Sequence, residues 1–209
     1  MIASAGVWAL DAESSRLEFA IKHLMFSTLR GRFGAFEGTL EVGADGAASA
    51  VGSVQAASID TNDPVRDGHL RSSADFFDVE SYPRIDFRST GIEGGSGGSV
   101  RIRGELTMRG ITRVVVLDGQ REDVESGTGS RIRLTLRGEL NRREFGLVWN
   151  QALDSGGALI GNTVKITAEI SAVNTGATSG AGRLSPGKTL DATPLRRNAR
   201  SHGRAAARG

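Results

Sequence analysis

The clearest structural signal in the sequence lies in residues 131–141, which read RIRLTLRGELN. Every second residue is apolar or glycine, and the residues between them are arginine, threonine, glutamate or asparagine. Successive side chains of a β-strand point to opposite faces of a sheet. The alternation therefore predicts a strand with one buried side and one side facing water.

Other parts of the chain show the same pattern. The alternation recurs in residues 16–24, 100–108 and 163–173. Less regular strands are expected near residues 6–11, 33–43, 49–59, 84–92 and 113–119. Turn-forming residues, as in 43–46 and 93–99, separate these segments. About eight strands with hardly any helix between them indicate an all-β domain, and periodicity alone leaves open a closed antiparallel barrel or a sandwich of two sheets.

One helix is expected among the strands. Residues 62–64 read Asn-Asp-Pro, which supplies an N-cap side chain followed by proline at the first helical position. Leu70, Ala74 and Phe77 then recur at helical spacing. We expect a short helix that lies across one end of the domain.

The 209 residues are enough for one sizeable core, which we place in a single domain over residues 1–174. Residues 175–209 lose the apolar periodicity and are expected to be a disordered tail. This tail carries a net charge of +6, so the domain carries −4 of the overall +2. We therefore expect no specific nucleic-acid partner, and only weak contact of the basic tail with anionic membrane or nucleic acid.

Several classes of function lack their usual residues. Cysteine is absent, so a disulfide, a thiolate metal site and a cysteine nucleophile are excluded. His23 and His69 are outside any metal-binding motif, and no GxSxG motif places a nucleophile. We expect no metal site and no catalytic residues, and the protein is predicted not to be an enzyme.

The start of the chain has no basic segment followed by an apolar run, and no segment approaches the roughly 18 apolar residues of a transmembrane helix. A cytoplasmic protein is expected.

The faces predicted to point inward combine large apolar side chains with glycines. The large ones are Phe19, Phe36, Phe87, Leu106 and Leu136, and the glycines are Gly34, Gly38, Gly104 and Gly138. Inward glycines can leave room for a ligand inside a barrel. They can equally mark bulges or tight curvature where the strands bend.

A series of short motifs follows in order between Trp8 and Val173. They are WALD (8–11) with Ser14, then His23, GRF (31–33), FEG (36–38), SIDT (58–61), RDGHLRS (66–72), DFFD (75–78), YP (82–83), Phe87, GELTMRG (104–110) and NRREFG (141–146). In order and spacing they resemble the bacterial YceI family of lipocalin-like, polyisoprenoid-binding proteins.

The resemblance implies an eight-stranded antiparallel lipocalin-like β-barrel with a short capping helix, often dimeric, which stores or carries a polyprenyl chain or an isoprenoid quinone. The alternatives are a carrier of fatty acids or fatty amides, and a filled barrel with a structural or interaction role. Expected ligand contacts are Phe19, Ile21, His23, Phe36, Phe76, Phe77, Phe87, Gly104, Leu106, Leu136, Gly138 and Phe145.

Four polar residues are candidates for binding a ligand head group, each beside a structural alternative. His23 shares the inward phase of its strand and either bonds a carbonyl or phosphate or is a satisfied core histidine. His69 belongs to the charged segment 66–71, which either meets the ligand or ties the helix to the barrel rim. Arg142 and Arg143 either bind an anionic head group at the barrel mouth or form structural ion pairs in a solvated loop.

Overall fold

The computed structural model describes residues 3–24, 27–124, 130–151 and 159–176. All of these ranges belong to one compact unit. The last strand continues to Gly176, beyond the domain boundary expected at residue 174. The rest of the predicted tail, residues 177–209, lies outside the described residues.

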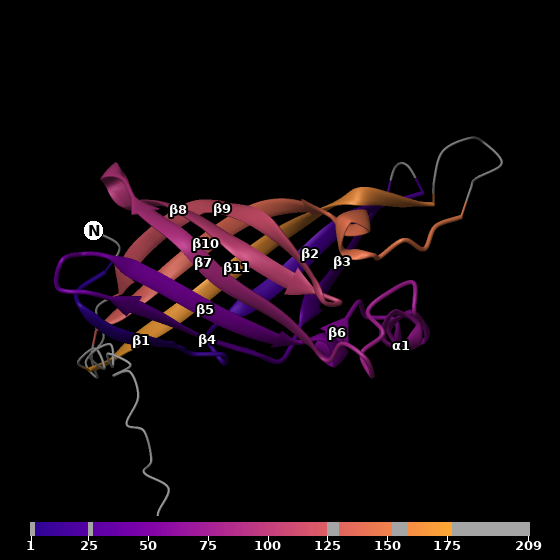
Figure 1. Cartoon of the computed structure of the whole chain (residues 1–209), viewed down its shortest axis with the longest axis horizontal. Helices are drawn as coiled ribbons and strands as arrows, with labels where there is room; N and C mark the ends of the chain where they lie inside the picture. The colour runs from indigo at the N-terminus through magenta and orange to yellow at the C-terminus, as the bar shows by residue number, and fades with distance from the viewer. Residues whose placement is uncertain (1–2, 25–26, 125–129, 152–158, 177–209) are drawn as a thin grey trace, which may run out of the picture. The chain divides into compact units, whose positions relative to one another are not determined.

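The described residues form a single antiparallel sheet (Figure 1). Its strands are β1 (Gly6–Leu10), β2 (Arg16–His23), β3 (Ser27–Phe33), β4 (Phe36–Val42), β5 (Ala48–Gln55), β6 (Ile59–Asp60), β7 (Arg84–Gly94), β8 (Ser99–Met108), β9 (Ile111–Val124), β10 (Arg131–Asn141) and β11 (Ile160–Gly176). The strongly alternating segment 131–141 is β10, with the bounds that its sequence predicts.

The sheet closes into a barrel with eight strand positions. The early part of β11 pairs with β2 and its last residues pair with β1, which in turn pairs with β4. β3 pairs with β2, and β6 with β3, so β1/β2, β3/β4 and β5/β6 each act as one long strand broken in the middle. The predicted all-β fold is confirmed, and the choice between barrel and sandwich is settled in favour of the barrel.

The break between β1 and β2 is held by a small polar cluster. Ser15 Oγ donates to the carbonyl of Asp11 at 2.6 Å and accepts from the N–H of Ser171 at 2.9 Å. Arg131 Nη1 donates to Asp11 Oδ2 at 2.6 Å and to Ser171 Oγ at 2.8 Å. These bonds join the break to β10 and β11, so the barrel stays closed where β11 exchanges one partner strand for the other.

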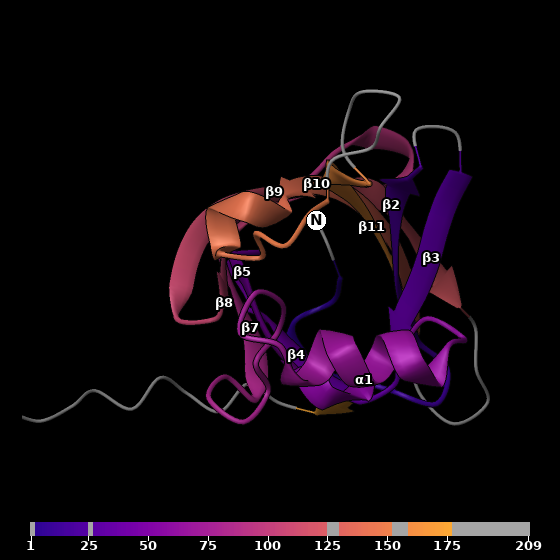
Figure 2. The ribbon, with the colours of Figure 1, turned by 90° about the vertical axis from the view of Figure 1, so that its right-hand side faces the viewer.

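The helix α1 (Pro64–Ser72) confirms the start predicted from the Asn-Asp-Pro sequence, but Ala74 and Phe77, which recur at helical spacing, lie beyond its end. Asp63 caps it, accepting from the N–H groups of Val65 and Arg66 at 3.1 Å. The pairing of β5 with β7 ends at Gln55 and Arg84, and the chain between β6 and β7 carries α1 across this end of the barrel (Figure 2). In the described ranges, no helix has both the length and the apolar character needed to cross a membrane.

Candidate ligand-binding cavity

The barrel encloses an inner cavity of about 240 Å³. Aliphatic and aromatic side chains from all eight strand positions line it, because the inward phase of each strand is apolar. The wall includes Trp8, Leu10, Leu17, Phe36, Leu40, Val54, Phe87, Ile102, Leu106, Val115, Leu117, Leu134, Leu136, Ala168 and Ile170. An apolar cavity of this kind has few groups to hold ordered water and is suited to hydrocarbon.

A second, outer cavity of about 400 Å³ lies at the α1 end. Its apolar wall includes Phe19, Ile21, Leu29, Ile59, Leu70, Phe76, Phe77, Leu147, Trp149, Ile160 and Val164. Met108, Leu140 and Ile166 belong to the walls of both cavities, so the two spaces adjoin at these side chains. The lumen therefore consists of two neighbouring apolar compartments.

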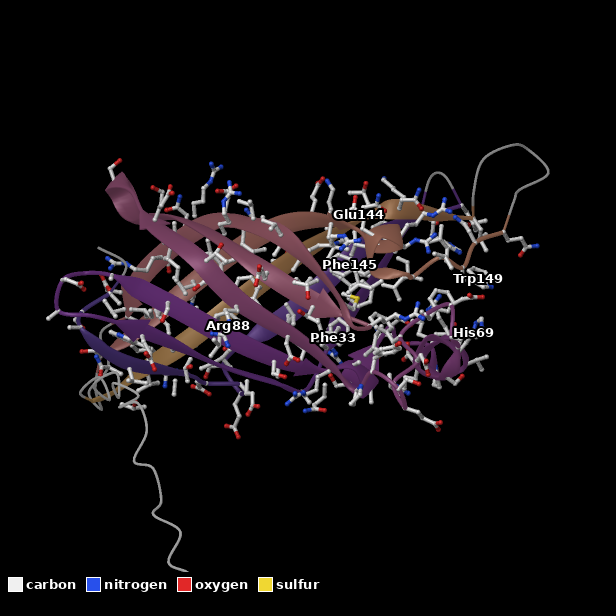
Figure 3. All side chains as sticks on the ribbon, in the orientation of Figure 1. Phe33, His69, Arg88, Glu144, Phe145 and Trp149 are labelled. Atoms are coloured by element: carbon white, nitrogen blue, oxygen red, sulfur yellow. The ribbon has the colours of Figure 1, made fainter. Side chains whose placement is uncertain are left out.

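Aromatic rings surround the outer cavity. The ring of His69 meets that of Phe76 edge-on at 5.3 Å and that of Trp149 at 6.0 Å, and the rings of Phe76 and Trp149 are 5.5 Å apart. Figure 3 shows His69 and Trp149 at the same end of the barrel. His69 is exposed whereas Phe76 is buried, so this group extends from solvent into the lumen.

Most of the expected contact residues divide between the two cavities. Phe36, Phe87, Leu106 and Leu136 line the inner one. The outer one is lined by Phe19, Ile21, His23, His69, Phe76, Phe77 and Arg142. Phe145 lines neither; it is 1% exposed and packs in the core with Phe76 and Leu147.

Two of the glycines expected to contact the ligand do not lie at a cavity wall. Gly104 and Gly138 line neither cavity. A Cβ atom at Gly104 would overlap the ring of Phe87 and lie 2.7 Å from the carbonyl oxygen of Arg88. At Gly138 it would lie 2.6 Å from Leu117 Cδ2. These two glycines accommodate neighbouring side chains and backbone rather than open space, whereas Gly38 does line the inner cavity.

The charged segment 66–71 ties the helix to the barrel. The buried carboxylate of Asp67 accepts from Thr61 N at 3.0 Å and from Thr61 Oγ1 at 2.6 Å. Arg71 Nε donates to the carbonyl of Ala57 at 2.8 Å, and its Nη2 donates to the carbonyl of Ile59. Arg66, His69 and Leu70 of this segment line the outer cavity, and the ring of His69 contacts the aromatic group there.

Arg142 begins the 3-10 helix η3 (Arg142–Phe145) and is only 3% exposed. Its Nε donates to the carbonyl of Gly161 at 2.8 Å, and its Nη1 donates to the carbonyl of Leu147. Burial, with a smaller contribution from Arg143, lowers the pKa of Arg142 below its ordinary value. A guanidinium nevertheless stays protonated in proteins, so the charge remains.

Arg143 and His23 differ in their placement. Arg143 is exposed and lines neither cavity, although it is the next residue after Arg142. His23 is half-buried on the wall of the outer cavity. In the described ranges, no three or more histidine or carboxylate side chains gather as a metal site requires.

Sequence reasoning missed several wall residues. Leu17 and Leu140 stand on inward phases that the alternation already indicates, whereas Trp8 lies in one of the less regular strands. Trp149 follows η3 in a segment without periodicity, and no sequence signal places it at the cavity.

Comparison with known proteins gives consistent matches. A family model described as a YceI-like domain matches residues 8–172. A UPF0312 protein of Staphylococcus aureus (strain bovine RF122 / ET3-1) is 32% identical over 166 residues, which cover 77% of this chain and 94% of that protein.

Two solved structures are similar to this chain at 20% identity. Burkholderia cenocepacia BcnA gives a TM-score of 0.66 over 78% of this chain and 98% of its own. A polyisoprenoid binding domain from Saccharophagus degradans, described as implicated in plant cell wall breakdown, gives 0.59 over 80% of this chain and 98% of its own. At this identity the likeness supports the barrel fold alone.

Proposed function

The chain belongs to the YceI-like domain family, and we propose that it binds a long isoprenoid lipid, a polyprenyl chain or an isoprenoid quinone, inside its barrel for storage or transport. The observation that carries this proposal is the pair of adjoining apolar cavities, of about 240 and 400 Å³, in the lumen. Together they offer a long apolar space with few polar partners. A branched hydrocarbon chain suits such a space.

Burial of the tail would supply the affinity. Each methylene removed from water contributes about 0.8 kcal/mol before the costs of ordering the chain are subtracted. The described polyisoprenoid binding domain of Saccharophagus degradans, which shares the fold, supports the same class of ligand. A binding role, rather than catalysis, fits walls that present mainly hydrocarbon to their contents.

The two cavities also argue against a filled barrel with only a structural role. The competing ligand is a fatty acid or fatty amide, which the same walls would accept. Organic extraction of the purified protein followed by mass spectrometry separates these possibilities. We expect an isoprenoid in the extract, in an amount close to that of the protein; a fatty acyl lipid at that ratio would contradict the isoprenoid assignment.

A further inference from the structure

Arg142 has a guanidinium nitrogen without a protein acceptor. Nε and Nη1 donate to the carbonyls of Gly161 and Leu147, whereas Nη2 is buried and has no hydrogen-bond partner in the part of the chain that the structure describes. The first two bonds explain how Arg142 fastens η3 to β11. They do not explain the third nitrogen, because a buried donor left unpaired costs free energy.

The charges around the outer cavity leave Arg142 without a counter-ion. Among the residues that line it, the cations are Arg66 and Arg142, and the one carboxylate is Asp63. Asp63 already caps α1, and its Oδ2 lies 3.4 Å from Arg66 Nη2. Arg66 also donates to Thr61 Oγ1 at 2.7 Å. The cavity therefore carries an excess positive charge at Arg142.

The arginine and histidine side chains of the wall lie at one end of the lumen. His23, His69, Arg66 and Arg142 all line the outer cavity and none of them lines the inner one. A lipid with a polar head and a long tail is therefore matched if its head lies in the outer cavity and its tail in the inner one.

We propose that Arg142 binds an oxyanion, a phosphate or carboxylate, in the head group of the lipid, whose tail then passes Met108, Leu140 and Ile166 into the inner cavity. This inference rests on the proposed function. A guanidinium donates well to such oxygens, and an anion would both satisfy Nη2 and compensate the buried charge. A neutral lipid of the same length would leave Nη2 without an acceptor and the buried charge without compensation.

The test compares two ligands that differ only in the head group, geranylgeranyl phosphate and geranylgeraniol, on protein stripped of lipid. Their affinities are measured through the fluorescence of Trp149, which lines the outer cavity. We expect the wild type to prefer the phosphate by about tenfold to a hundredfold, the range for a hydrogen bond to a charged group. Arg142→Gln should abolish most of this preference, whereas the matched control Arg143→Gln should keep it.

Equal affinity of the wild type for both ligands, or a full preference retained in Arg142→Gln, would overturn the inference. If Arg142→Gln does not fold, the salt dependence of the wild-type preference decides. A buried pair is screened weakly, so the preference should persist at high salt; its disappearance would place the phosphate on exposed cations instead and refute the role of Arg142.

Two further ligands complete the test. Geranylgeranoic acid should share the preference over the alcohol, because its carboxylate is also an oxyanion. Arachidic acid has the same carboxylate head but a straight tail. It should bind more weakly than geranylgeranoic acid, because the proposed site favours an isoprenoid tail. Failure of every prenyl ligand to bind the wild type would refute the proposed function, which is distinguishable from a loss of head-group preference alone.

Discussion

The ring of Phe87 covers Gly104, the residue on the neighbouring strand that has no side chain of its own. Phe87 pairs with Leu106 across β7 and β8, and its ring leans along the strand over Gly104. The absence of a side chain at Gly104 thus leaves room for the ring of Phe87, which lies in the wall of the inner cavity.

Replacing Gly104 should test this packing. We expect Gly104→Ala to lower the free energy of unfolding by about 1 to 3 kcal/mol, because the added Cβ must displace the ring or the Arg88 carbonyl. Gly91→Ala is the control, since a Cβ there meets nothing within 4 Å. Denaturant unfolding measures both. If Gly104→Ala were as stable as Gly91→Ala, the close contact with Phe87 would be wrong.

A glycine in the helix α1 should respond to alanine in the opposite direction. A Cβ atom at Gly68, inside α1, meets nothing within 4 Å. We expect Gly68→Ala to stabilise the protein by about 0.5 to 1 kcal/mol, because alanine costs less backbone entropy than glycine in a helix. The thermal unfolding midpoint should rise, and a fall would show that α1 needs the glycine for a reason other than helix formation.

Acidification should weaken the polar cluster that holds the break between β1 and β2. The hydrogen bond from Arg131 is the main cause that holds the pKa of Asp11 below its ordinary value. A carboxyl with a lowered folded pKa contributes stability above its unfolded pKa, about 4, and this is lost as the pH falls through the folded value.

We therefore expect Asp11→Asn to be less stable than the wild type at neutral pH and to lose less stability on acidification. Chemical unfolding between about pH 6 and pH 2 measures the two slopes. Identical slopes in the two proteins would show that the pair of Asp11 with Arg131 does not contribute to the acid sensitivity.

The junction between the cavities should limit ligand length. Leu140→Phe adds volume where the two walls meet. We expect it to lower the affinity for long prenyl alcohols at least tenfold and to leave the affinity for short ones almost unchanged, because a short chain needs only one cavity. Val114→Phe is the control, since Val114 is 60% exposed on β9. A Leu140→Phe protein that binds all lengths as the wild type does would contradict a continuous path.

The regular strands could be predicted because their signal is local. Residues 131–141 alternate without exception and form β10 over the same span. The break at 34–35, which separates β3 from β4, was not predicted, and the strand expected at 33–43 merged the end of β3 with β4. The break exists because β3 pairs with β2 while β4 pairs with β1, and such partners are not encoded locally.

The same limit applies to the site. The alternation indicates that Leu106 and Leu136 point inward, and both line the cavity. Whether Gly104 leaves a gap depends on the register that brings Phe87 beside it. The burial of Arg142 depends on the carbonyl of Gly161, 19 residues further along the chain, whereas Arg143 next to it is exposed.

The two tryptophans of the chain report on the two compartments separately. Trp8 lines the inner cavity and is 2% exposed, and Trp149 lines the outer one. The variants Trp149→Phe and Trp8→Phe each leave one reporter. Both should first be shown to unfold at temperatures close to that of the wild type.

The most direct test of an isoprenoid chain held along the lumen is a titration of these two variants with prenyl alcohols from geraniol to decaprenol. We predict that affinity climbs steeply with chain length and then levels off, and that short chains alter the fluorescence of one tryptophan whereas long chains alter both. An affinity that does not depend on length, or a longest ligand that never affects Trp8, would contradict the account.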